Sequence, residues 1–146
     1  MSNQAIAQRL LASIAGGTAT HAHLLTGPWA DHCTALALQA AALCCTGTAD
    51  PALLSRCPGY LQLGPEPILV DHIRELEERL SYRLEDGQRQ CVTLLHVHDM
   101  NTAAQNAFLK TLEEPPPQTL FLLAGREAGV LPTIRSRCTV WRQQVY

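Results

Sequence analysis

Apolar stretches of two lengths alternate along this chain and predict its secondary structure. Five short apolar runs are typical of buried strands, at Ala22–Thr26, Tyr60–Leu63, Val92–Val97, Leu120–Ala124 and Thr139–Gln143. Four longer segments favour helices, from Asn3 to about Ile14, Cys33 to Cys45, Val70 to about Leu84 and Thr102 to Leu112. Because strands alternate with helices, we expect an α/β fold in three layers, a five-stranded parallel sheet with helices on both faces.

Polar and helix-breaking residues mark the expected ends of these elements. Asn3 and Thr102 are suited to cap the first and last helices. A turn is expected at Glu85-Asp86-Gly87, and the prolines at 115–117 should stop the last helix abruptly. Ligands of parallel α/β sheets bind beyond the carboxyl ends of the strands, so we expect functional residues in the loops that follow strands.

Composition narrows the class of protein. The 146 residues suit one domain, and 47% of them are hydrophobic, which is enough to fill a core on both sides of a sheet. A net charge of −2 argues against a broadly basic nucleic-acid surface. No apolar run approaches the roughly 20 residues that cross a bilayer, and no signal peptide is recognisable, so a cytoplasmic protein without a membrane partner is expected. The six cysteines form no CxxC pair and are interpreted as free thiols.

The loop after the first strand lies where a phosphate-binding loop belongs. Such loops have the spacing GxxxxGK[ST], in which backbone N–H groups and the lysine hold phosphates while the hydroxyl binds magnesium. Gly27, followed by Pro28, and Thr34 match this pattern, but His32 replaces the second glycine and Cys33 replaces the lysine. A β-carbon at position 32 strains the loop, and the missing cation weakens any grip on a triphosphate. We therefore expect that nucleotide binding has been lost.

Two further positions lack the groups of a working nucleotide site. In P-loop enzymes an acidic residue near the phosphate loop holds magnesium. Here His96 stands at the degenerate magnesium position, and Asp99 comes too late in the chain. After the next strand, Gly125-Arg126 occupies a position where a hydroxyl or an amide would be usual. All of these changes indicate the same loss.

Histidines and thiols leave two other chemistries open. His96 and His98 alternate along a predicted strand and would share one face, where they could bind a metal, although a hydrogen-bonded core histidine is the favoured interpretation. Cys33 lies near a helix N-terminus, which suits a nucleophilic thiol. The adjacent His32 would not face it on a helix, so a thiol enzyme is disfavoured.

Three blocks of the chain resemble the AAA+ module of bacterial clamp-loader subunits, and in particular the delta-prime subunits of DNA polymerase III. These blocks are His21–Pro28, Ile68–Leu80 and Asn101–Cys138. Their most specific parts are the run Leu109-Lys110-Thr111-Leu112-Glu113-Glu114-Pro115-Pro116 and the motif Ser136-Arg137-Cys138. The resemblance implies that residues 1–146 form a single AAA+ core of the P-loop NTPase type. The helical lid and collar domains of relatives would lie outside these residues.

The resemblance also implies a role. Members of the family form a five-subunit ring that opens a sliding clamp and places it on primed DNA, with ATP between subunits. Delta-prime subunits commonly lack ATPase activity, and the arginine of their Ser-Arg-Cys motif acts on ATP bound by the adjacent subunit. That role carries over to Arg137, with Ser136 and Cys138 beside it at the interface; a surface salt bridge is the plainer alternative. Lys110 either couples ATP and DNA near the same interface or pairs with Glu113 or Glu114.

The resemblance therefore predicts a non-hydrolysing clamp-loader subunit that acts in DNA replication. Its partners would be gamma/tau-like and delta-like subunits and, through the assembly, the sliding clamp and primed DNA. No cofactor is expected. No metal is expected either, because the zinc module of relatives needs four spaced ligands, whereas only Cys44-Cys45 and the isolated Cys57 follow the phosphate-loop helix. Two alternatives remain, an ATPase with an atypical loop and a stand-alone scaffold.

Overall fold

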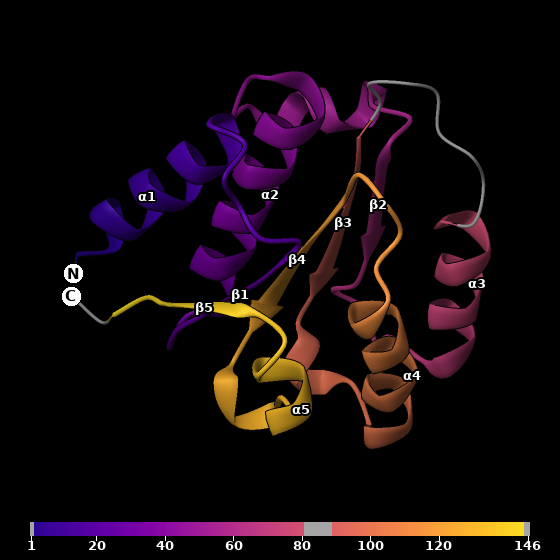
Figure 1. Cartoon of the computed structure of the whole chain (residues 1–146). Coiled ribbons are helices and arrows are strands. Elements are labelled where there is room, and N and C mark those ends of the chain that lie inside the picture. The colour runs from indigo at the N-terminus through magenta and orange to yellow at the C-terminus, as the bar shows by residue number, and fades with distance from the viewer. Residues whose placement is uncertain (1, 81–88, 145–146) are drawn as a thin grey trace.

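Five parallel strands form one sheet in the order β2-β3-β4-β1-β5 (Figure 1). The structure, a computed structural model, describes residues 2–80 and 89–144. The strands are β1 (Ala22–Thr26), β2 (Tyr60–Leu63), β3 (Gln90–Leu95), β4 (Thr119–Gly125) and β5 (Thr139–Arg142). Every pairing between neighbours is parallel, and β1 lies between β4 and β5. The predicted five-stranded parallel sheet is confirmed.

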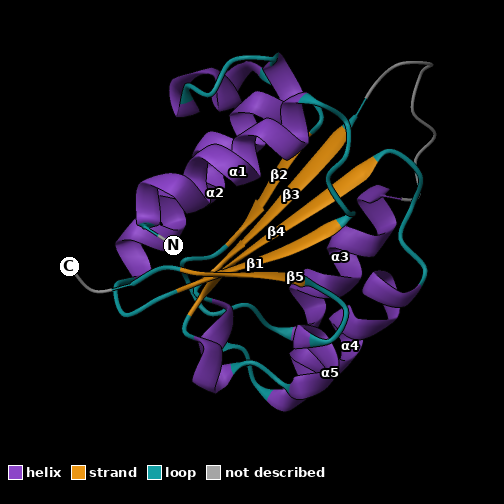
Figure 2. Ribbon diagram, turned by 60° about the vertical axis from the view of Figure 1, so that its left-hand side comes forward, coloured by secondary structure: helices purple, strands orange, loops and turns teal. Residues whose placement is uncertain are grey.

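Helices cover both faces of the sheet and give it three layers (Figure 2). On one face lie α1 (Asn3–Ala15) and α2 (Ala30–Thr46). On the other lie α3 (Val70–Leu80), α4 (Thr102–Glu113) and α5 (Pro132–Arg135). Short 3-10 segments follow β3 and β4, at Val97–Asp99 and Glu127–Gly129, and another, Pro51–Arg56, precedes β2. Among the described residues no helix is both long and apolar enough to cross a bilayer.

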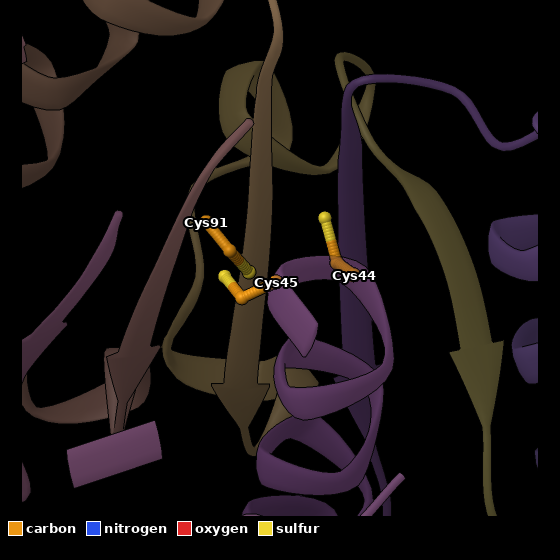
Figure 3. A group of neighbouring side chains, drawn as sticks. All are labelled: Cys44, Cys45 and Cys91. Atoms are coloured by element: carbon orange, nitrogen blue, oxygen red, sulfur yellow. The ribbon is translucent and has the colours of Figure 1, made fainter. Parts of the chain in front are cut away.

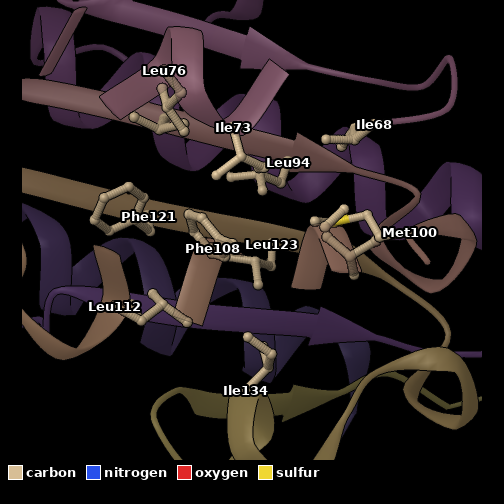
Figure 4. Close-up of a cluster of buried hydrophobic side chains, with 14 of the residues drawn as sticks. Ile68, Ile73, Leu76, Leu94, Met100, Phe108, Leu112, Phe121, Leu123 and Ile134 are labelled. Atoms are coloured by element: carbon tan, nitrogen blue, oxygen red, sulfur yellow. The ribbon is translucent and has the colours of Figure 1, made fainter. Parts of the chain in front are cut away.

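Two hydrophobic cores result from the alternation of side chains along the buried central strands. Leu24 of β1 belongs to the core beneath α3 and α4, whereas its neighbour Leu25 belongs to the core beneath α1 and α2. In the first core, Phe108 of α4 meets Phe121 of β4 edge-on, with ring centroids 5.4 Å apart (Figure 4). Every residue of β1, β3 and β4 is buried, as expected for strands covered on both faces.

The N-terminal cap differs from the prediction by one residue. The Ser2 side chain, not that of Asn3, caps α1 by accepting a hydrogen bond from the Ala5 N–H at 3.1 Å. Asn3 is the first helical residue and pairs with the other end of the chain. Its Nδ2 donates to the Gln144 carbonyl at 2.8 Å, and its Oδ1 accepts from the Gln144 N–H at 2.7 Å. Two hydrogen bonds between the Asn3 side chain and the Gln144 backbone therefore join the first helix to the segment after β5.

The cap of α4 is also shifted by one residue. Asn101, not Thr102, caps this helix, because its Oδ1 accepts a hydrogen bond from the Ala104 N–H at 2.8 Å. The helix ends at Glu113, directly before the expected stop at the prolines 115–117. Prediction and structure agree on the amphipathic α3, which the structure describes as far as Leu80. The predicted continuation to Leu84 and the turn at 85–87 lie outside the described residues.

Candidate functional site

The loop after β1 is too short to surround a phosphate. It consists of Gly27, Pro28 and Trp29, because α2 begins at Ala30, three residues before the predicted start at Cys33. Pro28 has no N–H to offer. His32, which the pattern places at the second loop glycine, is instead in the first turn of the helix, where it meets the exposed Trp29 ring edge-on at 5.1 Å. The degenerate loop is therefore a tight strand-to-helix turn.

Cys33, at the lysine position, points into the protein. Its side chain is fully buried, and its thiol donates a hydrogen bond to Gln143 Oε1 at 3.2 Å. Burial raises the pKa of the Cys33 thiol to about 11, so the group stays protonated and neutral at physiological pH. A buried protonated thiol is a poor nucleophile, which removes the thiol-enzyme alternative for this residue. The same burial leaves no room for a lysine head group at this position.

Gln143 closes the space in front of the degenerate loop. Its N–H donates to the Thr26 carbonyl at 2.7 Å and extends the pairing of β1 with β5 by one residue. A β-carbon on Gly27 would lie only 3.1 Å from Gln143 Cβ, so the two segments are already in close contact. Between Gly27, His32 and Gln143, in the part of the chain that the structure describes, no water-sized space remains. This contact could not be predicted from the sequence, because it depends on strand register. 

Thr34 keeps the hydroxyl of the phosphate-loop pattern without its function. It lies one turn into α2, and its hydroxyl is buried with no hydrogen-bond partner among the described residues. In a working loop this hydroxyl would reach magnesium. Here Gln143 packs against the loop in front of Thr34, so we expect that the hydroxyl does not reach a magnesium ion. Of the residues predicted for this site, Thr34 is the one whose surroundings leave a polar group unsatisfied.

The magnesium position lies in a turn and not on a strand. The prediction of a strand through Val97 was wrong: β3 ends at Leu95, His96 has a left-handed backbone with φ of 58°, and Val97–Asp99 is a 3-10 turn. His96 and His98 still come together, since their rings stack with centroids 5.5 Å apart. Their nitrogens and an Asp99 oxygen lie within 4.8 Å of one another.

A hydrogen bond to His98 argues against a metal at this cluster. His98 Nδ1 accepts the backbone N–H of Arg126 at 3.0 Å, so in the neutral ring the proton must sit on Nε2. That proton points toward Asp99, whose Oδ1 is 3.6 Å away. A metal on Nε2 would require an imidazole without any proton. Burial lowers the pKa of His98, which keeps the ring neutral. His98 is therefore a hydrogen-bonded, largely buried histidine, as the favoured interpretation had it.

His98 also explains the glycine at the sensing position after β4. A β-carbon on Gly125 would lie 2.6 Å from His98 Nδ1 and 3.0 Å from the backbone nitrogen of Val97. No other residue fits without a shift, because real β-carbons do not approach other atoms so closely. The histidine ring therefore fills the space that a hydroxyl or amide side chain would need. The His98 ring and the missing side chain at Gly125 therefore fit each other.

Arg137 is held in a compact turn at the end of α5. Its N–H donates to the Ile134 carbonyl at 3.0 Å, and the Ser136 hydroxyl donates to the Thr133 carbonyl at 3.0 Å. Cys138 packs against the hydrophobic core, and burial raises the pKa of its thiol to about 12. Ser136 and Cys138 thus fix the turn from both sides. The Arg137 side chain remains half exposed at the surface, at 50%.

Arg137 and the loop at Gly27 lie at opposite ends of two adjacent strands. Arg137 precedes β5, whereas Gly27 follows β1. These strands run parallel with Thr26 level with Arg142, and β5 from Thr139 to Arg142 covers about 10 Å. The length of β5 therefore separates Arg137 from the loop of its own chain.

Arg137 has an acidic neighbour in the described part of the chain, whereas Lys110 does not. A guanidinium nitrogen of Arg137 lies 3.6 Å from an oxygen of Glu113, and both side chains are about half exposed. Exposed pairs of this kind are weak. Lys110 is exposed on α4 and, among the described residues, forms no ion pair within 4.0 Å. Its predicted pairing with Glu113 or Glu114 is thus not observed.

The five-stranded parallel sheet with helices on both faces gives this chain the fold of an AAA+ module. A crystal structure of a DNA polymerase III gamma subunit-related protein from Thermotoga maritima matches 96% of this chain and 45% of that chain, with a TM-score of 0.73 and 28% identity. RuvB from Thermotoga maritima matches the whole chain and 47% of its own, with a TM-score of 0.60 and 17% identity, a likeness of fold alone.

The sequence comparisons are more specific. The family model for the DNA polymerase III delta subunit matches residues 60–145, more than half of the chain. DNA polymerase III subunit delta' from Pseudomonas aeruginosa is 39% identical over 90% of this chain, and that from Escherichia coli is 43% identical over 56%. The gamma/tau subunit from Mycobacterium tuberculosis is 33% identical over 88%. The chain belongs to the delta' family of DNA polymerase III subunits. It spans 46%, 26% and 25% of the lengths of these three relatives.

Proposed function

We propose that this chain is the AAA+ core of a non-hydrolysing clamp-loader subunit of the delta' kind, which donates Arg137 to ATP held by a neighbouring subunit. Its direct partners are gamma/tau-like and delta-like subunits. Through that assembly it acts on the sliding clamp and primed DNA during replication, in the cytoplasm. The chain itself contributes contacts and one guanidinium, and it neither binds nor hydrolyses ATP.

One observation carries this proposal, the opposite placement of the arginine and the loop. Arg137 lies before β5, and the loop at Gly27 lies beyond the other end of the adjacent strand β1. A guanidinium at the amino end of β5 cannot reach a phosphate at the loop of its own chain. It can reach a phosphate that a second subunit presents at its surface. This geometry supports action in trans.

Electrostatics support the same division of roles. Cys33 is neutral and buried where the phosphate-binding lysine would be, so the loop offers no fixed cation. Arg137 is half exposed, and its ion pair with Glu113 is a weak one between exposed side chains. A triphosphate carries more charge than that carboxylate and would compete effectively for the guanidinium. In the transition state of phosphoryl transfer the arginine then stabilises the charge that develops on the γ-phosphate.

The test for the arginine is ATP hydrolysis by a reconstituted loader that contains this chain. With Arg137→Ala, single-turnover hydrolysis at the adjacent site should fall by about 10³-fold or more, the usual worth of such an arginine. Arg135→Ala is the matched control, because Arg135 lies in the same segment but pairs with Glu127 at 3.9 Å. Equal ATPase activity in the two variants would refute the trans role.

The test for the loop is nucleotide binding by the chain alone. A fluorescent ATP analogue with magnesium should show no saturable binding at micromolar concentrations, whereas a gamma/tau subunit serves as the positive control. Micromolar binding that Thr34→Ala weakens would instead support the alternative of an ATPase with an atypical loop. The two tests are independent, since the first concerns Arg137 and the second concerns the Gly27 loop.

A further inference from the structure

Three thiols lie close together at the amino ends of the strands, whereas the Gly27 loop lies at their carboxyl ends. Cys44 and Cys45 lie in the last turn of α2, and Cys91 is the second residue of β3. Their sulfur atoms all lie within 4.8 Å of one another. Figure 3 shows Cys45 and Cys91 pointing toward each other while Cys44 extends beside them. All three are free thiols, and they take no part in the function proposed above.

Two of these thiols, Cys44 and Cys45, are partly exposed at a cavity, and the third is buried behind them. A cavity of about 630 Å³ is lined by Cys44, Cys45, Cys57 and Arg89, among other residues. Cys44 is partly exposed, whereas Cys91 is completely buried. A small solute that enters this cavity therefore meets Cys44 before it can meet Cys91.

The neighbours of Cys44 favour its ionised form. Hydrogen bonds from the Cys45 and Cys91 thiols, in that order, lower the pKa of Cys44, and the nearby charge of Arg89 lowers it further. Burial and the carbonyl end of α2 oppose this effect. The same hydrogen bonds raise the pKa of Cys45 and of Cys91, so these two thiols stay protonated. These shifts favour a negative charge on Cys44 beside two protonated thiols.

The surroundings favour a reactive thiolate over a metal ligand set. Structural zinc is closed by four protein ligands, and the group of sulfurs within 4.8 Å has three among the described residues. The Cys57 sulfur instead lies 4.0 Å from the Cys45 carbonyl. Arg89 adds a positive charge beside Cys44, which repels a cation but stabilises a thiolate. An accessible thiolate next to another thiol is the arrangement found in peroxide-sensitive cysteines.

We propose that Cys44 is a peroxide-reactive thiol and that Cys91 resolves it. The Cys44 thiolate attacks one oxygen of a hydroperoxide, the O–O bond breaks, and hydroxide or alkoxide leaves with its electron pair. Cys44 is thereby oxidised to the sulfenic acid, and the peroxide is reduced. The Cys91 sulfur then attacks the Cys44 sulfur, its proton leaves with the hydroxyl as water, and a Cys44–Cys91 disulfide forms.

Chain geometry selects Cys91 over Cys45 as the resolving thiol. Adjacent Cα atoms are about 3.8 Å apart across a trans peptide. Disulfides normally span Cα atoms at about 4.4 Å or more, so a bond between Cys44 and Cys45 would distort the peptide between them. Cys91 comes from a different element and is free of that restriction. The disulfide would bind the end of α2 to the beginning of β3.

The experiment treats the whole chain with hydrogen peroxide, digests it under non-reducing conditions and identifies the products by mass spectrometry. Unmodified protein should give a disulfide between the peptide with Cys44-Cys45 and the peptide with Cys91. Cys45→Ser should keep that disulfide, and Cys44→Ser should slow thiol oxidation by about tenfold or more. Cys91→Ala, which suits the buried site, should leave a Cys44 sulfenic acid that dimedone traps. Cys57→Ser, which removes a thiol of the same cavity that lies outside the group of three, is the matched control and should leave the crosslink unchanged.

The pH dependence of the oxidation rate distinguishes a reactive thiolate from an ordinary protonated thiol. For the unmodified chain the rate of oxidation should be nearly constant between about pH 6 and 8, because Cys44 is already ionised. Cys45→Ala removes the contact that lowers the pKa of Cys44 most, and it should move the rise of the rate to higher pH. Unchanged oxidation in Cys44→Ser, a crosslink that needs Cys45 and not Cys44, or stoichiometric zinc on the purified thiols would each overturn the proposal.

Discussion

His98 Nδ1 accepts the backbone N–H of Arg126 at 3.0 Å and so joins the carboxyl ends of β3 and β4. The ring stands where a side chain at Gly125 would have to be. Cys33 is similarly committed, since its thiol is bound to Gln143. Where the phosphate-loop pattern has a lysine this chain has Cys33, and where a hydroxyl or an amide would be usual it has Gly125, whose surroundings the His98 ring fills. Introducing the side chain of the pattern at either position should therefore cost stability.

Removing the His98 ring should reduce stability and its dependence on pH. The pKa of His98 is lowered by burial from its ordinary value of 6.5, so the unfolded chain binds the proton more tightly. The free energy of unfolding must then fall as pH drops below about 6.5 and level off below the folded-state pKa. His98→Asn keeps an acceptor but does not titrate, and should lose part of this slope. His98→Ala should also lose about 1 kcal/mol.

Urea unfolding at several pH values would measure both effects. Asp99, Arg126 and His96 lie close enough to affect the titration of His98, with Asp99 raising its pKa and the other two lowering it. Burial also lowers the pKa of His23, so a smaller slope of the same sign should remain in His98→Asn. An unchanged slope in that variant would mean that His98 does not titrate with folding.

Gly125→Ala should be destabilising by about 1–3 kcal/mol, because the new β-carbon would lie 2.6 Å from His98 Nδ1. In the double variant with His98→Ala the ring is gone, and part of the cost should be recovered. A double-mutant cycle measured by chemical denaturation should give a coupling energy of about 0.5 kcal/mol or more. Strict additivity would show that the ring and the glycine are independent. 

Cys33→Lys should fail to restore nucleotide binding. Position 33 is fully buried, so the ammonium would have to enter the core or force α2 to move. We expect a loss of about 3 kcal/mol or more in the free energy of unfolding. Cys33→Ala, which loses only the bond to Gln143, should cost about 1 kcal/mol. A stable Cys33→Lys protein that binds ATP would contradict the placement of this residue.

Arg137→Ala should leave the fold almost unchanged. The pair with Glu113 spans 3.6 Å between half-exposed side chains, and such pairs contribute about 0.2–1 kcal/mol. Thermal unfolding of the variant should therefore show a shift of only a few degrees at most. A large loss of stability would mean that Arg137 has a structural role, and ATPase measurements on the variant would then need another interpretation.

Apolar periodicity was sufficient to predict the sheet and its covering helices, because strands buried on both faces leave an unmistakable apolar pattern. Boundaries were less predictable. Ser2 and Asn3 are both good caps, and the choice between them depends on Gln144, which lies at the far end of the chain. Likewise α2 begins at Ala30 because Gly27 packs against Gln143, a contact set by strand register.

The candidate residues divide in the same way. The surface turn at Arg137 was predictable because Ser136 and Cys138 mark it locally, and the structure confirms that turn, while the role of Arg137 in trans stays a prediction. The roles of His98 and Cys91 were not, since each depends on an element distant in sequence. His98 matters through Arg126, and Cys91 meets Cys44 only when β3 lies beside the end of α2.

The separation of Arg137 from the Gly27 loop gives the module a direction. A subunit that has both an arginine of this kind and a working phosphate loop can have a like subunit on each side, and each subunit then places its arginine at the ATP of the next. Under the function proposed above, this chain donates an arginine to a neighbour but has no ATP to which a neighbour could donate one. It would thus occupy the first place in such a row, and the composition of the assembly would be counted from it.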